Sequence, residues 1–250
     1  RAFKSEEYWS IEAALQSRGS AQTDTRTNAE KIVSAILTKI DGKVLEKFDI
    51  KTKEQADAIV DELKSCEFSV AGIERKELHK NPPAPFTTST MQQEAAKRLG
   101  FSSKKTMLIA QHLYENGHIT YMRTDSVNLS QDSVAAAKDW LNENLGSNYT
   151  LSAPRLFEAK SKLAQEAHEA VRPTKVFDVP DKIELTDEGE KKLYKLIWQR
   201  FMASQMPQAK ISTTVAEILA NSKSQSPNSK QYGLRATGQQ IVFDGYLKIW

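Results

Sequence analysis

The sequence is poor in the residues that build covalent cross-links and membrane spans. It has a single cysteine among 250 residues, Cys66, which excludes an internal disulfide framework and a zinc site built from cysteines. No apolar run approaches the roughly 18 residues that a membrane-spanning helix needs. Residues 1–7 lack the apolar segment of a signal peptide. We therefore expect no membrane partner and a reducing compartment, the cytoplasm.

Several nucleotide-binding and hydrolase motifs are also missing. The sequence has no Gly-x-x-x-x-Gly-Lys-Ser/Thr loop, no Gly-x-Gly-x-x-Gly fingerprint and no Gly-x-Ser-x-Gly elbow. It has no Asp-x-Asp pair either. The nearest aspartate pairs, Asp57 with Asp61 and Asp178 with Asp181, lie in an amphipathic segment and in a proline-containing loop. These absences give no support to a kinase, dehydrogenase or hydrolase, and they predict no metal site in this chain.

The charge is nearly balanced but unevenly distributed. Lys and Arg total 35 against 32 Asp and Glu, so the formal net charge of +3 is too small to argue for nucleic acid. Residues 82–124 hold only two acidic residues and five basic ones, namely Lys97, Arg98, Lys104, Lys105 and Arg123. On charge alone, this excess favours a solvated helix face.

The first third of the chain is predicted to mix strands and helices. Apolar residues alternate over 9–15 and 68–78, which favours half-buried strands, and 44–50 is a further strand candidate. Residues 28–40 show helical spacing of Ile32, Ala35, Ile36 and Lys39. A capping box at 52–55 precedes an amphipathic helix that reaches residue 63.

The middle of the chain is predicted to be helical. Asn81-Pro-Pro-Ala-Pro85 forces an extended path, which we interpret as a domain crossing. Two short helices joined by Gly100-Phe-Ser-Ser103 predict a helix-turn-helix, with 118–123 as a short strand or wing. The helices that we expect are 89–100, 102–117, 130–145, 162–171 and 187–206.

The last part returns to strand-like alternation. Strands are expected over 209–219, 232–236 and 240–243, and residues 246–250 form a further strand-like run. The predicted fold class is α+β, with a β-rich domain of residues 1–81 and 207–250 and an inserted helical domain of 82–206. Because the chain starts at Arg1 rather than Met and stops within an apolar run, we expect it to be a piece of a longer protein.

The densest group of reactive side chains is Ile119-Thr-Tyr-Met-Arg-Thr-Asp-Ser126. A tyrosine hydroxyl can act as a nucleophile towards phosphorus, but at an ordinary pKa near ~10 it needs a base or a cationic neighbour. If residues 119–123 are extended, Tyr121 and Arg123 project from the same face. The planar fork of arginine suits a phosphate. The group is suited to chemistry on a phosphate, but Tyr121 taken alone is better explained as a half-buried aromatic residue on a strand.

The second group is Gln165-Glu-Ala-His-Glu-Ala-Val-Arg-Pro-Thr174. His168 and Arg172 are four residues apart, so they share a face if the segment is helical, and both could contact one phosphate. Glu169 could instead pair with Arg172 as a surface ion pair worth less than ~1 kcal/mol. The spacing alone favours this plainer interpretation.

Together these motifs resemble a known family. Residues 119–130, with Met122 between Tyr121 and Arg123, are similar to the active-site tyrosine motif of type IA DNA topoisomerases of the bacterial branch. Residues 81–90 and 165–174 resemble two further signatures of that family, in the right order and at plausible spacing. Weaker similarity covers essentially the whole chain.

The resemblance implies a mechanism and a fold. Tyr121 would attack a phosphodiester of single-stranded DNA and become linked to the 5′ phosphate, so that the strand could be resealed without ATP after strand passage. Negatively supercoiled DNA would thereby relax. Arg123 would position the scissile phosphate, and the candidate DNA-binding residues are His168, Arg172, Thr120 and Asp125. The fold would be a helical tyrosine domain with a helix-turn-helix, carried by a β-rich arch.

The resemblance also shows what this sequence does not contain. The family holds Mg²⁺ in a Toprim domain with an Asp-x-Asp cluster, and that domain is absent here. We expect the isolated chain to be a monomer that binds DNA weakly and cleaves little or none. The base that takes the proton of Tyr121 is not identified by any residue of the chain.

Two other functions fit parts of the sequence. A winged helix-turn-helix regulator would use Lys97, Arg98, Lys104 and Lys105 on duplex phosphates and would need no nucleophile. A scaffold that clamps DNA mechanically would keep Tyr121 as a core residue, so that its replacement by Phe would change at most stability. The three motifs together favour the topoisomerase.

Overall fold

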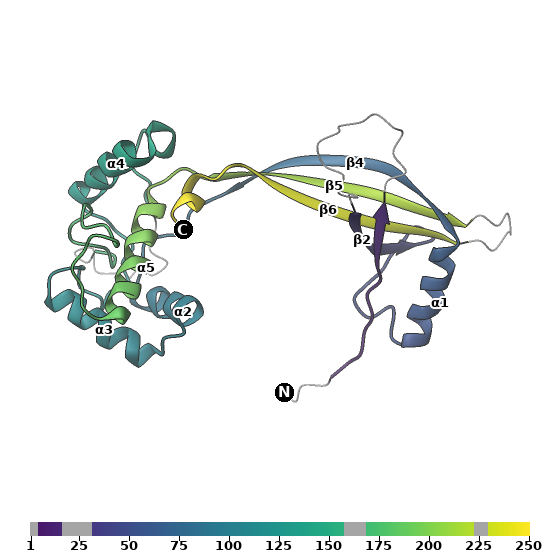
Figure 1. Ribbon diagram of the computed structural model, residues 1–250, viewed down its shortest axis with the longest axis horizontal. Helices are drawn as coiled ribbons and strands as arrows, with labels where there is room; N and C mark the ends of the chain where they lie inside the picture. Colours follow the sequence, from purple (N-terminus) through teal and green to yellow (C-terminus); the bar gives the residue numbers. More distant parts are fainter. Residues whose placement is uncertain (1–4, 17–31, 158–168, 223–229) are drawn as a thin grey trace. The chain divides into compact units, whose positions relative to one another are not determined.

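The structure is a computed structural model that describes residues 5–16, 32–157, 169–222 and 230–250. The chain divides into two compact units, one of residues 1–78 with 212–240 and one of residues 79–211 with 241–250. Among the described residues, the first unit holds most of the β-sheet and helix α1, and the second holds helices α2 to α5 (Figure 1). The predicted α+β class is confirmed as a mixed fold with an antiparallel sheet.

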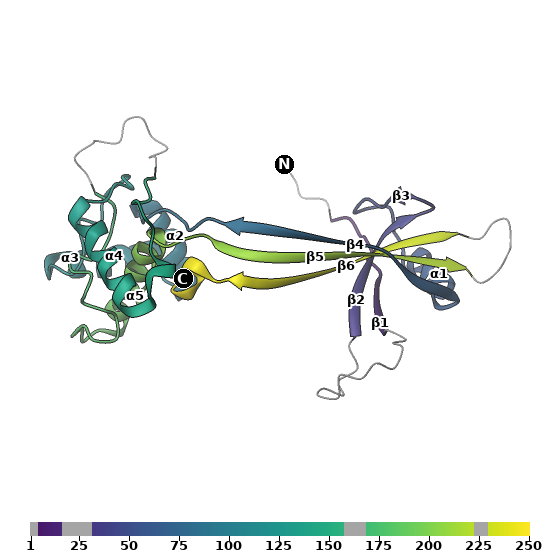
Figure 2. The same ribbon diagram turned by 90° about the horizontal axis from the view of Figure 1, so that it is seen from above.

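The sheet has the strand order β1-β2-β6-β5-β4, with β3 paired to β2. β4, β5 and β6 are the long strands and lie side by side in Figure 2. Pairing of β2 with β6 brings Leu37 opposite Leu234, although these residues are far apart in the sequence. The strands are β1 Glu12–Gln16, β2 Ile32–Ile40, β3 Lys43–Val44, β4 Cys66–Lys80, β5 Ala209–Ser222 and β6 Gln231–Phe243.

Helix α1, Lys53–Lys64, covers the core of the sheet unit. Its N-cap is Thr52, whose side chain accepts a hydrogen bond from the Gln55 N–H at 3.3 Å, as the capping motif predicts. The helix buries Ala56 and Leu63 in a cluster that also holds Leu37, Tyr232 and Leu234 of the sheet. The predicted helix and its start are therefore confirmed.

The helix predicted over residues 28–40 is wrong, because its described part is strand β2. The segment also contains the branched residues Ile32, Val33 and Ile36, and residues of this kind favour strands. Pairing with β1 on one side and β6 on the other decided the structure. Ala35 and Leu37 then point to the core with the period of two that a strand requires.

Two further strand predictions in this unit need correction. Of the predicted strand 44–50 only Val44 is in a strand, at the end of β3, since the chain has no regular strand from residue 45 to the cap of α1. The two short strands expected over 232–243 are one continuous strand, β6. Gly238 lies within this strand and does not interrupt it. The strands predicted around 9–15, 68–78 and 209–219 are confirmed.

The helical unit is organised by local caps. Each of the four α-helices that the structure describes here begins after a side chain that accepts a backbone N–H bond, and these caps are Thr87, Ser102, Ser130 and Asp187. Gly100 ends α2 in the left-handed conformation, with φ of 67°. The cap of α2 is thus Thr87, and the helix begins one residue before the predicted start at residue 89. The helices are α2 Thr88–Leu99, α3 Ser103–Glu115, α4 Gln131–Leu145 and α5 Glu188–Ser204.

Helix α5 lies at the centre of this unit. Leu193, Ile197 and Phe201 form its fully buried apolar face, and Trp198 contacts Trp140 of α4 edge to face. α3 and α5 pack closely at Gly189, where an added Cβ would come 2.9 Å from a side-chain carbon of α3. Among the described residues, none of the helices is long and apolar enough to cross a membrane.

The last ten residues pack with the helices. The strand-like run 246–250 contains a short 3₁₀ helix, η2, Gly245–Lys248, rather than a strand. Trp250 contacts the ring of Phe86 edge to face, and the guanidinium of Arg98 lies 3.7 Å from its ring centre. Burial of the aromatic residues against the helical core explains the difference. The expected division placed residues 207–250 wholly with the β-rich domain, whereas 241–250 belong to the helical unit.

Candidate functional site

The segment that carries Tyr121 is extended, with alternating exposure. Tyr121 is 45% exposed, and Arg123 and Asp125 are also exposed, whereas Met122 and Thr124 are buried. The segment is not a regular strand, because its only ladder contact within the described residues is an isolated bridge from residue 119 to residue 173. The side chains of Tyr121 and Arg123 nevertheless share the exposed side of the segment, as alternation requires.

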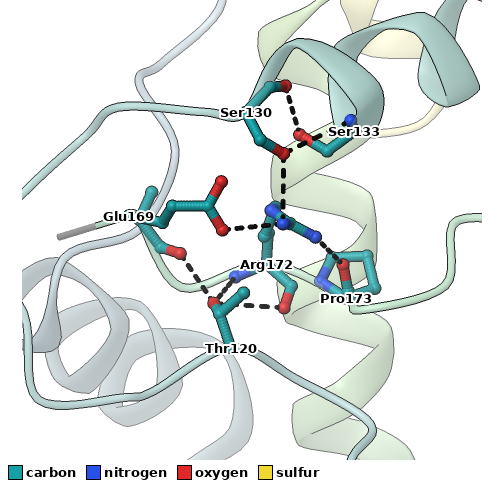
Figure 3. Close-up of polar contacts among 7 residues, drawn as sticks. Thr120, Ser130, Ser133, Glu169, Arg172 and Pro173 are labelled. Carbon is teal, nitrogen blue, oxygen red and sulfur yellow. Dashed lines mark hydrogen bonds and ion pairs between the residues drawn. The ribbon is translucent and has the colours of Figure 1, made fainter. Parts of the chain in front are cut away.

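On one side of Tyr121, Thr120 ties the segment to residues 170–172 (Figure 3). The Thr120 N–H donates to the Arg172 carbonyl at 2.9 Å, and its hydroxyl donates to the Ala170 carbonyl at 2.7 Å. The Thr120 hydroxyl also accepts from the Arg172 N–H at 3.0 Å. Thr120, a predicted DNA-binding residue, therefore has its hydroxyl occupied within the protein.

On the other side of Tyr121, Thr88 at the start of α2 holds the backbone. The Thr88 hydroxyl donates to the Met122 carbonyl at 2.6 Å and accepts from the Thr124 N–H at 2.8 Å. The Thr88 N–H donates to the Thr124 carbonyl at 2.8 Å. Tyr121 thus lies between two backbone attachments that come from the two other sequence motifs.

Arg172 joins three segments through its guanidinium (Figure 3). It donates to a Glu169 carboxylate oxygen at 2.7 Å, to the Pro173 carbonyl at 2.9 Å and to the hydroxyl of Ser130, the cap of α4, at 3.2 Å. Its side chain is only 12% exposed. The ion pair with Glu169 that the sequence suggested is present, and the fork that would bind a phosphate is used inside the protein.

His168, the other predicted DNA contact of this motif, lies outside the described residues, as does most of the helix predicted over 162–171. The described end of that segment is extended rather than helical. The Ala170 N–H donates to the Asn128 carbonyl at 2.9 Å, and the Val171 N–H donates to the Phe86 carbonyl at 2.8 Å. These bonds bring residues 170–172 beside the segment of Tyr121.

The reactive groups themselves remain accessible. The ring of Tyr121 contacts the ring of Tyr114 on α3 edge to face, with centroids 5.1 Å apart, which restricts the orientation of its hydroxyl. Within the described part of the chain, no hydrogen bond or ion pair engages the Tyr121 hydroxyl or the Arg123 guanidinium. An exposed nucleophile and an exposed, unpaired cation on one side of a restrained segment can act together on a phosphate.

No metal site is formed by the described residues. Among residues 5–16, 32–157, 169–222 and 230–250, no three His, Cys, Asp or Glu side chains gather in a way that could hold an ion. The residues present therefore do not fit Mg²⁺, and no step of the chemistry can be assigned to a metal held by them.

The sequence analysis missed two residues of this site, Thr88 and Tyr114. Thr88 lies in the motif of residues 81–90, in which all four residues from 87 to 90 carry hydroxyl groups. A helix cap uses only one or two of them. That surplus is a signal that one hydroxyl serves another purpose. Tyr114 carries no comparable signal, since a half-exposed tyrosine near a helix end is ordinary.

Comparison with known proteins agrees with this geometry. A family model described as DNA topoisomerase matches residues 1–250. The chain is 40% identical to DNA topoisomerase 1 of Rickettsia felis, in an alignment that covers 99% of this chain and 31% of that protein. It is 39% identical to DNA topoisomerase 1 of Pasteurella multocida, in an alignment that covers 100% of this chain and 26% of that protein. The solved structure of full-length topoisomerase I from Thermotoga maritima matches with a TM-score of 0.68 and 35% identity, over 87% of this chain and 34% of that one.

The chain therefore spans less than a third of the length of the curated relatives named above. Their similarity nevertheless runs through all three motifs that meet at Tyr121. The family match over the full length, the relatives and the solved structure lead to one conclusion: the chain belongs to the bacterial type IA DNA topoisomerase family.

Proposed function

We propose that this chain supplies the nucleophile of a type IA topoisomerase that breaks and reseals one DNA strand. The observation that carries the proposal is the arrangement of Tyr121 and Arg123, exposed side by side along a segment that Thr120 and Thr88 restrain. Similarity to proteins named DNA topoisomerase 1 supports it.

The chemical step is a transesterification. The Tyr121 oxygen attacks a backbone phosphorus, the bond from phosphorus to the 3′ oxygen breaks, and the 5′ phosphate stays on the tyrosine. The tyrosine proton passes to a base, and the leaving 3′ oxygen takes up a proton. Because one phosphoester replaces another, the reverse attack by the 3′ hydroxyl reseals the strand without ATP. Strand passage between the two steps relaxes negative supercoils.

Arg123 acts on the charge of the phosphate. Its exposed guanidinium can bind two non-bridging oxygens at once, which places the phosphorus near Tyr121 and stabilises the charge that develops in the transition state. Asp125, exposed two residues further on, and His168 are proposed to contact the strand near this point. Single-stranded and negatively supercoiled DNA are the proposed substrates.

The two units take the family roles in this proposal. Residues 79–211 with 241–250 serve as the tyrosine domain, with α2 and α3 as its helix-turn-helix, and the sheet unit serves as part of the arch. Mg²⁺ belongs to a Toprim domain that this sequence does not contain. The chain alone, a monomer, would then bind DNA weakly and cleave little.

A duplex-binding regulator is not favoured. Two of the four basic residues that it would use are engaged within the protein: Arg98 pairs with Glu94 at 2.9 Å, and the Lys105 ammonium lies 4.4 Å from the ring centre of Phe101. The similarity to topoisomerases over the full length of the chain also argues against a regulator.

Covalent trapping tests the proposal. Labelled single-stranded DNA is mixed with the chain, with and without a separately produced Toprim domain and Mg²⁺, and is then denatured and sized. We expect an adduct that requires the Toprim domain, disappears in Tyr121→Phe and persists in Tyr8→Phe, a matched tyrosine that is 49% exposed. An adduct that survives Tyr121→Phe, or tight duplex binding with no adduct under any condition, would contradict the proposal.

A further inference from the structure

We infer that Thr88 is a positioning residue for Tyr121 and Arg123. The inference deepens the proposed function and rests on it, because it concerns how the protein aligns the nucleophile and the phosphate-binding cation. It concerns the side-chain hydroxyl of Thr88, since its backbone N–H would be present in any residue but proline.

Thr88 contacts the backbone on both sides of Arg123. Its hydroxyl bonds to the carbonyl of Met122 at 2.6 Å and to the N–H of Thr124 at 2.8 Å, the residues on either side of Arg123. Both belong to buried residues, with Met122 fully buried and Thr124 8% exposed. One hydroxyl therefore sets the path of the backbone that presents both Arg123 and Tyr121.

Loss of this hydroxyl cannot be repaired locally. Valine has nearly the shape of threonine, yet it leaves a buried carbonyl and a buried N–H without partners, and such groups are costly to leave unpaired. The segment must then move to reach other partners or water. Displacement of reacting groups by about 1 Å can slow a reaction ~100-fold, even when the altered residue does not touch the substrate.

The neighbouring hydroxyls have a different purpose, which makes them controls. Thr87 and Thr90 form the capping box of α2, each side chain bonding to the backbone N–H of the other. Within the described residues, neither side chain hydrogen-bonds to residues 122–124. Replacing Thr90, the third residue of α2, therefore disturbs the same helix end without removing a bond to the segment of Tyr121.

The experiment compares Thr88→Val, Thr88→Ser and Thr90→Val with the wild-type chain. Each is supplied with the Toprim domain and Mg²⁺, and the rate of adduct formation at saturating labelled single-stranded DNA is measured together with the dissociation constant for that DNA. Hydrogen exchange of the Thr124 amide is measured on each chain alone. Melting temperatures show that the compared proteins are folded at the assay temperature.

We expect Thr88→Val to lower the saturating rate about 10- to 100-fold with little change in DNA affinity. Its Thr124 amide should exchange faster than in the wild type. Thr88→Ser restores the hydroxyl and should restore both the rate and the protection of the amide, and Thr90→Val should keep both even if α2 melts earlier.

Three results would overturn the inference. A wild-type rate in Thr88→Val would refute the positioning role while the proposed function stands. An equal fall in Thr88→Val and Thr90→Val would assign the effect to the stability of α2. Absence of any adduct in the wild type would refute the proposed function, and the role of Thr88 with it.

Discussion

Replacing Arg172 by Met tests whether this residue holds the site together or binds DNA. Methionine has a similar length and no charge, so Arg172→Met removes the three bonds of the guanidinium to Glu169, Pro173 and Ser130. The bond to Glu169 also joins two charges, although Glu169 is 31% exposed and can be hydrated once it is released.

The magnitude follows from these partners. A hydrogen bond to a charged group contributes ~1.5–3 kcal/mol, and a bond to a neutral partner contributes ~1 kcal/mol. Hydration of the released Glu169 and of the Ser130 hydroxyl offsets part of the sum, which lowers the expected loss of unfolding free energy to about 2–3 kcal/mol. For a domain of this size, the melting temperature should fall by about 5–10 °C.

Calorimetry of the chain measures this loss, and Lys175→Met is the matched control. Lys175 is exposed, so its replacement removes the same charge and should change the stability by less than about 0.5 kcal/mol. The salt dependence of single-strand binding is measured on the same proteins. Because the Arg172 fork is occupied, its loss should leave the slope of log affinity against log salt unchanged.

A phosphate contact would have a different signature. The slope would then fall by about 0.7, the value for one charge on single-stranded nucleic acid. An unchanged melting temperature together with a reduced slope would refute the structural role of Arg172 and would restore it as a DNA-binding residue.

Three more predictions concern the other parts of the fold. Hydrogen bonding by Tyr232 lowers the pKa of Glu62, so Tyr232→Phe should be less stable than the wild type above pH 4.5, the ordinary pKa of a glutamate. The difference in stability should shrink as the pH falls below that value, which denaturation at several pH values measures. Burial raises the pKa of the Cys66 thiol, so alkylation of this thiol at pH 8 should be slow until denaturant unfolds the sheet unit. An alkylation rate equal to that of a small free thiol would contradict the burial of Cys66. Gly245→Ala should destabilise the helical unit, because φ is 50° and the new Cβ would lie 2.5 Å from a backbone oxygen, whereas Gly238→Ala has open space; equal melting temperatures would refute this.

The helices of the second unit could be predicted because their signals are local. A hydroxyl or carboxylate cap at Ser102, Ser130 and Asp187 begins three of them, and glycine follows the ends of two. Caps act within three or four residues, so no distant partner can change their meaning. The same holds for Thr52 and α1.

The strand β2 could not be predicted, since its partners are distant. Ile32, Ala35, Ile36 and Lys39 fit the helical period by coincidence. Pairing with β1, and with β6 nearly 200 residues later, decides against the helix. The strand-like run 246–250 could not be predicted correctly for a similar reason. Its aromatic residues are buried against Phe86 and the helical core, a contact that no local pattern reveals.

The sequence by itself determined the family, the capped helices and the exposure of Tyr121 and Arg123 on one side of their segment, because motifs and caps consist of residues close together in the chain. Tertiary structure alone decided what Thr88, Thr120 and Arg172 do. Their partners in other segments lie 34 to 52 residues away. Whether a hydroxyl or guanidinium contacts DNA or bonds within the protein is decided only when its neighbours in space are known. The physical reason is that hydrogen bonding depends on distance and direction, whereas sequence reports only order.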